Sequence, residues 1–286
     1  MGLGHGWMVA RVHVRRPAAQ PGRVGDTSPM RRLLLAIGLL LALALPATAG
    51  AQDADTAAAN GKPTKLPPLA TTADPSYRPN RSRTYVARLL IRTGVYLKPG
   101  ARTAARAISP WIPSTGNPVV LQVLARRVDV RGDGWLKVRM PERPNNSTAW
   151  IRESSASVAK DPMRIIISLR RHTLTVFRHG KPVRRVGVAL GAPETPTPRG
   201  RFAIYQKVRE PSASPLGPWA LHLTAHSNVL FEYDGGPGRV AIHGARGVLW
   251  AQAGTNVSHG CIRVPDGGIA LIAALVHAGT PVDIVP

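Results

Sequence analysis

The sequence has one cysteine in 286 residues, Cys261, so no disulfide bond can form within the chain. It is also poor in acidic residues, with 15 Asp and Glu against 38 Lys and Arg, and the formal charge of +23 favours polyanionic partners. The basic residues are scattered, without the clustered arginines and aromatic residues of a nucleic-acid-binding face. We therefore expect no nucleic-acid partner. The charge fits either a solvated basic surface or attraction to another class of polyanion.

Long hydrophobic runs are missing as well. The apolar run over residues 33–45 has 13 residues, whereas a membrane-spanning helix needs about 20. Two arginines precede this run and the small-residue pattern Ala47-Thr48-Ala49 follows it, which is the order of a secretory signal. We expect a signal at 30–51 that is cleaved after Ala51, and an exported protein. An uncleaved anchor is the alternative, and membrane contact is expected only through this segment.

The remaining N-terminal residues have little core-forming content. Residues 1–29 match no part of a signal, which suggests that translation starts at Met30. Residues 52–82 are rich in Ala, Thr and Pro and lack the aromatic and β-branched content of a folded core, so they are expected to be a disordered linker.

From residue 83 onward the pattern changes to short strands. Residues 83–158 contain two alternating runs around Arg131-Gly132-Asp133-Gly134, and Asp-Gly between such runs predicts a β-hairpin. In its second arm Leu136, Val138 and Met140 share one face. The segments "GWLKVRM" and "NSTAWI" resemble the bacterial SH3-like barrel, a small module of exported proteins, which implies such a barrel over 83–158.

Residues 163–286 also indicate a mainly β domain. The segments "MRIIISLRRHTLTVFRHGKPVRRVGVALG", "WALHLTA" and "RVAIHG" predict strands, with turns near 170–173 and at 179–180. The only convincing helix begins with Asp266 as its N-cap, follows the cysteine, and ends before Gly279. His222 and His226 are expected to be ordinary strand and loop residues.

The cysteine lies in the polar segment "NVSHGCIRV". Taken singly, His259, Gly260 and Arg263 have structural interpretations as a core histidine, a turn and a surface charge. A second histidine, His243, ends a predicted strand, and the following loop returns the chain to Ser258. A nearby imidazole or helix N-terminus lowers the pKa of a thiol and makes it a nucleophile.

The neighbours of the cysteine fit acyl-transfer chemistry. Beside a nucleophile, glycine lets backbone N–H groups approach a developing oxyanion, and Arg263 is placed to bind a carboxylate. One cysteine with two histidines lacks the ligand number of a closed zinc site. We therefore expect neither metal nor cofactor.

His243, fourteen intervening residues and then Ser258-His259-Gly260-Cys261 resemble the signature of the L,D-transpeptidase catalytic domain. The resemblance spans 163–285 and includes "TPTPRGRF" and "GTPVDIV". It implies that Cys261 is the nucleophile and His243 the general base and acid, with its ring oriented by the Gly244 carbonyl. It further implies that His259 and Gly260 lie beside the oxyanion. For substrate contacts we expect Arg263, Ser258 and Trp250, the last as a residue of the substrate groove.

The implied activity is the cross-linking of peptidoglycan stem peptides, which serve as donor and acceptor. Cys261 would release a terminal D-alanine, and the amine of a neighbouring stem would capture the thioester at the third residue. Anionic cell-wall polymers are possible further partners. Capture by water would give an L,D-carboxypeptidase instead. A wall-binding protein without catalysis is the alternative from another class.

Overall fold

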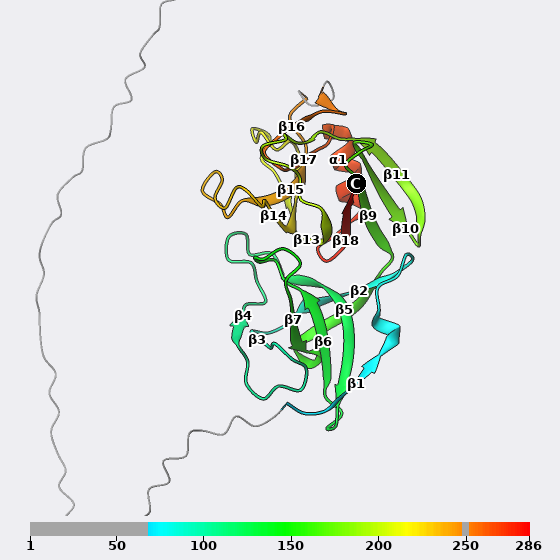
Figure 1. Cartoon of the computed structure of the whole chain (residues 1–286), viewed down its shortest axis with the longest axis vertical. Helices are drawn as coiled ribbons and strands as arrows, with labels where there is room; N and C mark the ends of the chain where they lie inside the picture. Colours follow the sequence, from blue (N-terminus) through cyan, green and yellow to red (C-terminus); the bar gives the residue numbers. More distant parts are fainter. Residues whose placement is uncertain (1–67, 248–251) are drawn as a thin grey trace, which may run out of the picture. The chain divides into compact units, whose positions relative to one another are not determined.

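The computed structural model describes residues 68–247 and 252–286. Predictions for 1–29, for the signal at 30–51, for most of the linker and for Trp250 fall outside these residues. The described elements are mainly strands, in agreement with the expected β class (Figure 1). Within the described ranges, no helix is both long and apolar enough to cross a membrane.

The first set of strands builds a six-stranded sheet with the order β7-β6-β5-β2-β8, and β1 pairs with β5 outside this path. A two-stranded ladder, β3 with β4, accompanies it. Its members are β1 (Thr71–Asp74), β2 (Thr84–Leu89), β3 (Thr93–Val95), β4 (Arg106–Ile108), β5 (Val120–Asp129), β6 (Gly134–Arg139), β7 (Thr148–Arg152) and β8 (Ala156–Asp161), with 3-10 helices at Pro75–Tyr77 and Glu153–Ser155. Whether this small β-domain is an SH3-like barrel stays a prediction.

The predicted Asp-Gly hairpin is present between β5 and β6. Asp129 organises its turn, because one carboxylate oxygen accepts the N–H groups of Arg131 and Asp133 at 2.9 and 3.1 Å. The other oxygen accepts the indole N–H of Trp135 at 3.1 Å. Trp135 and Leu136 are both fully buried, so the two faces of this arm are covered.

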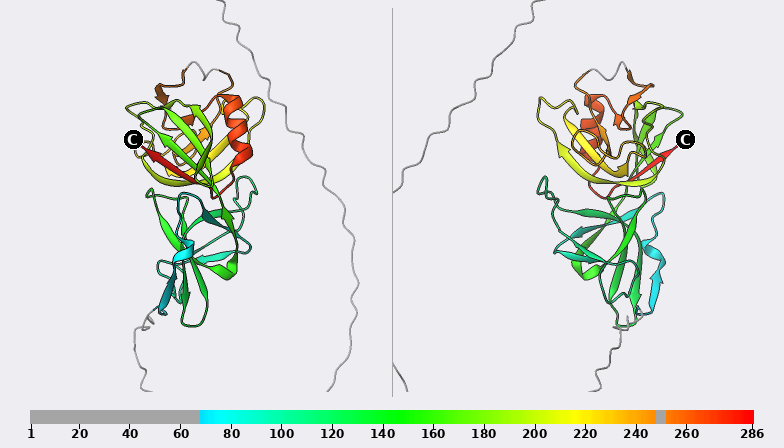
Figure 2. Two further views of the ribbon diagram at one scale, coloured as in Figure 1. Left: turned by 90° about the vertical axis from the view of Figure 1, so that its right-hand side faces the viewer. Right: turned by 60° about the vertical axis from the view of Figure 1, so that its left-hand side comes forward.

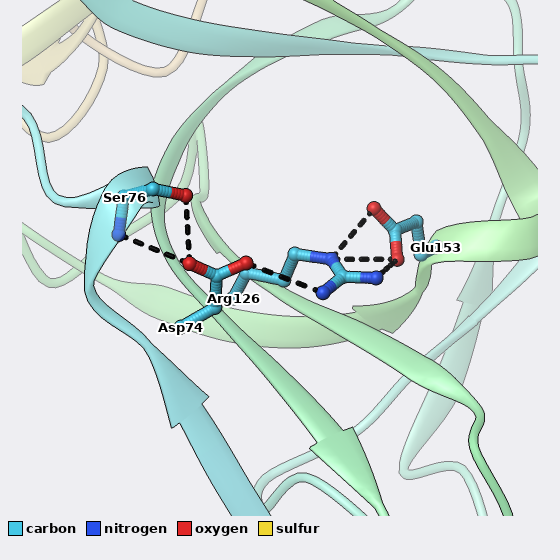
Figure 3. A network of polar contacts seen from close by, with 4 residues as sticks. All are labelled: Asp74, Ser76, Arg126 and Glu153. Carbon is cyan, nitrogen blue, oxygen red and sulfur yellow. Dashed lines mark hydrogen bonds and ion pairs between the residues drawn. The ribbon is translucent and has the colours of Figure 1, made fainter.

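The linker prediction for 52–82 is wrong at its C-terminal end. Residues 71–74 form β1, which pairs in antiparallel register with β5. Asp74 also accepts a hydrogen bond from Arg126 at 3.3 Å, and Arg126 in turn pairs with Glu153 at 2.8 Å (Figure 3). Tyr77 stacks on Tyr85 with ring centroids 4.3 Å apart. Composition missed this segment because its order comes from pairing with distant residues.

The second set of strands forms an eight-stranded sheet with the order β11-β10-β9-β18-β13-β14-β15-β17. The predicted turns at 170–173 and 179–180 connect its first three strands (Figure 1). The elements are β9 (Met163–Ser168), β10 (Thr173–Arg178), β11 (Lys181–Gly187), β12 (Leu190–Gly191), β13 (Gly200–Arg209), β14 (Trp219–His226), β15 (Arg239–His243), β16 (Asn256–Ser258), β17 (Ile262–Arg263), α1 (Asp266–Leu275) and β18 (Pro281–Val285). The small β12–β16 pair stands beside this sheet.

Helix α1 packs against β14 and β15 (Figure 2). Its residues Ile269 and Ile272 are fully buried in the hydrophobic core of this half. The predicted helix is therefore present, but its N-cap is Pro265, and Asp266 is the first helical residue. The Asp266 carboxylate does not cap the helix, because it accepts hydrogen bonds from backbone N–H groups of the loop after β15.

Candidate active site

The parallel pairing of β15 with β17 brings the cysteine and the first histidine together. Ile242 is opposite Ile262 and His243 is opposite Arg263 in the register. Cys261 immediately precedes β17 and therefore reaches Ala241 on the neighbouring strand. The Ala241 N–H donates to the Cys261 sulfur at 3.4 Å. His243 and Cys261 are 18 positions apart in sequence, and they come to the same end of the sheet because β15 and β17 pair directly.

His243 is buried, with 6% of its surface exposed. Its Nδ1 lies 2.5 Å from the Gly244 carbonyl oxygen. A carbonyl can only accept, so Nδ1 carries the proton, and Nε2 of the neutral ring is an acceptor. Burial lowers the pKa of His243 to about 4, against the opposing effect of the Gly244 carbonyl. At neutral pH the His243 ring is therefore uncharged and can accept a proton.

Cys261 is half-buried, and its thiol forms no disulfide bond. Burial raises the pKa of the Cys261 thiol, and the Ala241 N–H and the Arg263 charge offset this only in part. The expectation of a lowered thiol pKa is therefore wrong for the free protein, since desolvation dominates. The resting pair consists of a thiol and a neutral imidazole.

A tight turn over 258–261 presents the cysteine. The Ser258 hydroxyl donates to the Cys261 carbonyl at 2.6 Å and accepts the Gly260 N–H at 3.1 Å. Gly260 has φ +109°, a conformation that side-chain-bearing residues rarely adopt. Ser258 is 2% exposed, so its hydroxyl builds the turn, and its expected substrate contact has no support from this geometry. The Gly260 N–H predicted for the oxyanion is likewise engaged by Ser258.

Asp266 fixes the turn that follows His243. Its Oδ1 accepts the N–H groups of Ala245 and Arg246 at 2.8 and 3.2 Å. A Cβ atom on Gly244 would lie only 2.3 Å from the same oxygen, so this approach requires glycine. The first residue of α1 thus holds the peptide whose carbonyl orients the His243 ring. Sequence reasoning missed this contact, because it assigned Asp266 to the helix cap.

His259 lies at the exposed rim of the turn. Its Nδ1 is 3.2 Å from the Tyr233 hydroxyl, and the two rings are 4.9 Å apart. Tyr233 belongs to the 227–238 loop between β14 and β15. Tyr233 was not foreseen from the sequence, because nothing in the sequence relates the 227–238 loop to the cysteine segment.

Residues of the first sheet's β6–β7 connection bind the 227–238 loop. The Arg143 guanidinium donates to the carbonyl oxygens of Ser227 and Leu230 at 2.7 and 3.0 Å. The Asn145 side chain pairs with both backbone groups of His226, each at 2.8 Å. The loop that carries Tyr233 is therefore anchored at its start by polar contacts from the N-terminal part of the unit 61–286.

Arg263 is partly buried on β17 and donates to Gln252 at 3.2 Å. The Gln252 contact was not foreseen from the sequence. His222 and His226 lie on β14, as expected. Throughout the ranges 68–247 and 252–286, no three His, Cys, Asp or Glu side chains are grouped closely enough to hold a metal ion.

Comparisons with known proteins identify the family that residues 162–284 resemble. The family profile described as "YkuD: L,D-transpeptidase catalytic domain" matches residues 162–284. L,D-transpeptidase 1 of Mycobacterium tuberculosis is 33% identical over 127 residues, which cover 42% of this chain and 49% of the relative. The chain thus spans about half the length of that relative.

Two further proteins complete the comparison. The solved structure of L,D-transpeptidase 3 from Mycobacterium tuberculosis with a faropenem-derived adduct is 18% identical to this chain, with a TM-score of 0.37 over 54% of this chain and 91% of that one. The putative L,D-transpeptidase YkuD of Bacillus licheniformis is 31% identical over 125 residues, which cover 44% of this chain and 67% of that protein. With identity and coverage of this extent, and with the profile matching residues 162–284, the chain belongs to the L,D-transpeptidase family.

Proposed function

We propose that this protein is an exported, wall-associated enzyme that cross-links peptidoglycan stem peptides between their third residues. One observation carries the proposal. The thiol immediately precedes β17, the buried neutral imidazole ends β15, and these two strands pair directly, while the Gly244 carbonyl holds the imidazole with Nε2 as an acceptor. This pair provides a nucleophile and a base of the kind that acyl transfer requires.

In the first half-reaction, the Cys261 sulfur attacks the carbonyl carbon that joins the third residue to the terminal D-alanine. The thiol proton moves to Nε2 of His243 as the C–S bond forms. The imidazolium then gives this proton to the departing amine, the C–N bond breaks, and D-alanine leaves. A thioester between Cys261 and the donor stem remains.

In the second half-reaction, the side-chain amine of a neighbouring stem attacks the thioester. It loses a proton to His243, the C–S bond breaks, and the proton returns to the Cys261 sulfur. The product is an amide between two third residues, and the enzyme regains its starting state. No net oxidation or external energy source is needed, because one amide replaces another.

The surrounding residues support this sequence in different ways. A backbone N–H of the 258–261 turn other than that of Gly260, which Ser258 engages, would stabilise the oxyanion, where such donors contribute about 3–4 kcal/mol in comparable sites. Arg263 would bind a substrate carboxylate. His259 and Tyr233 would contact the stem at the exposed rim.

The test is mass spectrometry of the purified protein incubated with a tetrapeptide muropeptide, beside a Cys261→Ala variant. A dimer that has lost one D-alanine, formed by the wild type alone, would establish both the activity and the nucleophile. A tripeptide monomer without dimer would identify an L,D-carboxypeptidase. Unchanged substrate with retained wall binding in both proteins would contradict catalysis.

A further inference from the structure

A second concave site lies apart from Cys261 and His243. It is a cavity of about 440 Å³, within the usual range for small-ligand sites. Its walls come from the segment before β2 and from β2, β5, β6, β9, β13 and β18, all within the unit 61–286. None of the residues described in the candidate active site lines it.

The walls of this cavity carry a strong excess of positive charge. Its charged lining residues are five arginines and one carboxylate, namely Arg81, Arg83, Arg139, Arg164, Arg201 and Asp283. The carboxylate is already paired with Arg164. Arg83 donates to the Ser76 carbonyl, whereas the charge of Arg201 repels that of Arg139, and an anion between these two would offset the repulsion.

Arg139 is the most deeply placed of the five, with 7% of its surface exposed. Its Nε donates to Gln122 at 3.0 Å and its Nη1 to Asn146 at 3.4 Å. No acceptor within residues 68–247 and 252–286 pairs with its Nη2. Burial lowers the pKa of Arg139 and the charge of Arg201 lowers it further, while Asp283 opposes both. Its Nη2 is therefore available to an anion in the cavity, which would offset the cost of burying the charge.

A buried hydroxyl in the wall adds an independent indication. Thr84 is 2% exposed, and its Oγ1 has no hydrogen-bond partner in the part of the chain that the structure describes. Thr84 lines the cavity, between the arginines of the segment before β2 and Arg139 on β6. Buried polar atoms of native proteins nearly always have a partner. Because this oxygen is buried, a ligand oxygen would satisfy it once the Thr84 side chain rotates towards the cavity.

We propose that the cavity binds a phosphate group, held by Arg81, Arg139 and Arg201 with the Thr84 hydroxyl as an additional donor. These three arginines come from three separate segments of the chain, which suits the tetrahedral array of phosphate oxygens better than a planar carboxylate. A phosphate monoester also carries about −1.5 to −2 at pH 7 and so offsets more of the excess charge. The site does not depend on the proposed transpeptidation, since binding is measured without turnover.

The first test is titration of the full chain with inorganic phosphate at constant ionic strength, by calorimetry and by thermal unfolding. We expect saturable binding and a rise in Tm that chloride does not reproduce. Arg81→Gln and Arg201→Gln alter exposed side chains, which limits the risk of misfolding, and each should weaken phosphate binding about tenfold by removing a charge-assisted contact. Arg184→Gln, on exposed β11 outside the cavity, is the matched control and should bind phosphate like the wild type.

Thr84→Val tests the buried hydroxyl. This variant removes an unpartnered polar atom, so it should fold at least as stably as the wild type without phosphate and bind phosphate severalfold more weakly. Equal weakening by Arg184→Gln, or an equal Tm rise in chloride, would overturn the site in favour of general charge screening. Acetate or citrate binding as tightly as phosphate would overturn the assignment to a phosphate group.

The source of the group is decided by larger probes. Soluble polyphosphate and vesicles of phosphatidylglycerol would be compared for binding that is lost in Arg201→Gln and kept in Arg184→Gln. Dependence on Arg201 with polyphosphate alone would identify a polymer, and dependence with vesicles would identify a lipid headgroup. Binding of every probe without dependence on Arg201 would overturn the proposal.

Discussion

Cys261 and His243 meet a substrate at neutral pH as a thiol and an imidazole, because burial raises the pKa of the first and lowers the pKa of the second to about 4. A thiol of this kind is protected until a substrate carbonyl is in place. The proton transfer to Nε2 then accompanies the attack, and the buried pair is not separated into charges beforehand.

Alkylation of the single cysteine by iodoacetamide tests this protonation state directly. The thiolate is the species that reacts, so the rate should rise with pH to a half-maximum above the value of an ordinary cysteine, roughly 8.5. The same protein unfolded in urea provides the control and should show the ordinary value. A rate that is already constant below pH 7 would instead indicate a preformed thiolate.

The sequence indicated the thiol and the imidazole of the site, but it did not indicate the residues that position them. Cys261, His243 and Gly244 could be predicted because a strand-end histidine and a glycine-flanked cysteine have a recognisable spacing. Ala241, Tyr233 and Asp266 could not, because their contacts arise only from strand pairing and loop packing. The direction of the thiol pKa also depends on burial, which no local sequence pattern reveals.

Helix α1 contributes to the candidate active site through its first residue, Asp266, which holds the turn after His243. Asp266→Ala removes the acceptor that holds the Ala245 and Arg246 N–H groups and should free the Gly244 carbonyl from its fixed position. We expect kcat/KM to fall by about ten- to a hundredfold, in line with the loss of an orienting hydrogen bond. Steady-state kinetics of D-alanine release would measure this.

Asp266→Asn provides the matched comparison, since an amide oxygen can still accept one of these bonds. It should retain much more activity than Asp266→Ala, and the acid limb of its pH–rate profile should remain near that of the wild type. Equal losses in both variants would mean that the charge of Asp266 matters, and not its acceptor geometry.

The 227–238 loop depends on contacts with the β6–β7 connection. Asn145→Ala removes two bonds to the His226 backbone and leaves the Arg143 contacts in place. We expect faster proteolysis within the loop and a several-fold higher KM, because Tyr233 is then less well positioned. Asn117→Ala, in the β4–β5 connection, alters the same residue type away from the loop and should change neither quantity.

The element order of the catalytic half was predictable from alternating patterns and turn residues. The hairpins at 170–173 and 179–180 are of this kind, since their turns are local. Strand β1 was missed because the residues 71–74 have no apolar alternation, and they form a strand only through pairing with β5.

For the molecule as a whole, two buried histidines predict how stability depends on pH. Burial lowers the pKa of both His243 and His226 to about 4. The unfolded chain takes up protons on these residues below about pH 6.5 while the folded chain does not, so stability must fall as the pH drops from 6.5 towards 4. The expected loss is up to about 2 kcal/mol per histidine between pH 7 and pH 5.

Urea unfolding at pH 7, 6 and 5 would measure this slope, and His226→Gln should reduce it. Burial also lowers the pKa of His222, which contributes to the slope that remains together with His243. His277 does not contribute in the same range. Its pKa is raised by Asp161, so its stabilisation is complete below the unfolded value and is lost only as the pH rises through the folded value. An unchanged slope in His226→Gln would show that His226 is protonated in the folded protein.

Strand β18 occupies the middle of the eight-stranded sheet, between β9 and β13, although it is formed by residues 281–285. During synthesis, strands β9 to β17 therefore emerge without the strand that joins β9 to β13. The first sheet has all of its own strands long before that moment. Folding of the catalytic half must wait until residues 281–285 have emerged, so the nucleophile cannot be assembled before then, and a chain cut off before β18 would lack the centre of its sheet and not merely an edge.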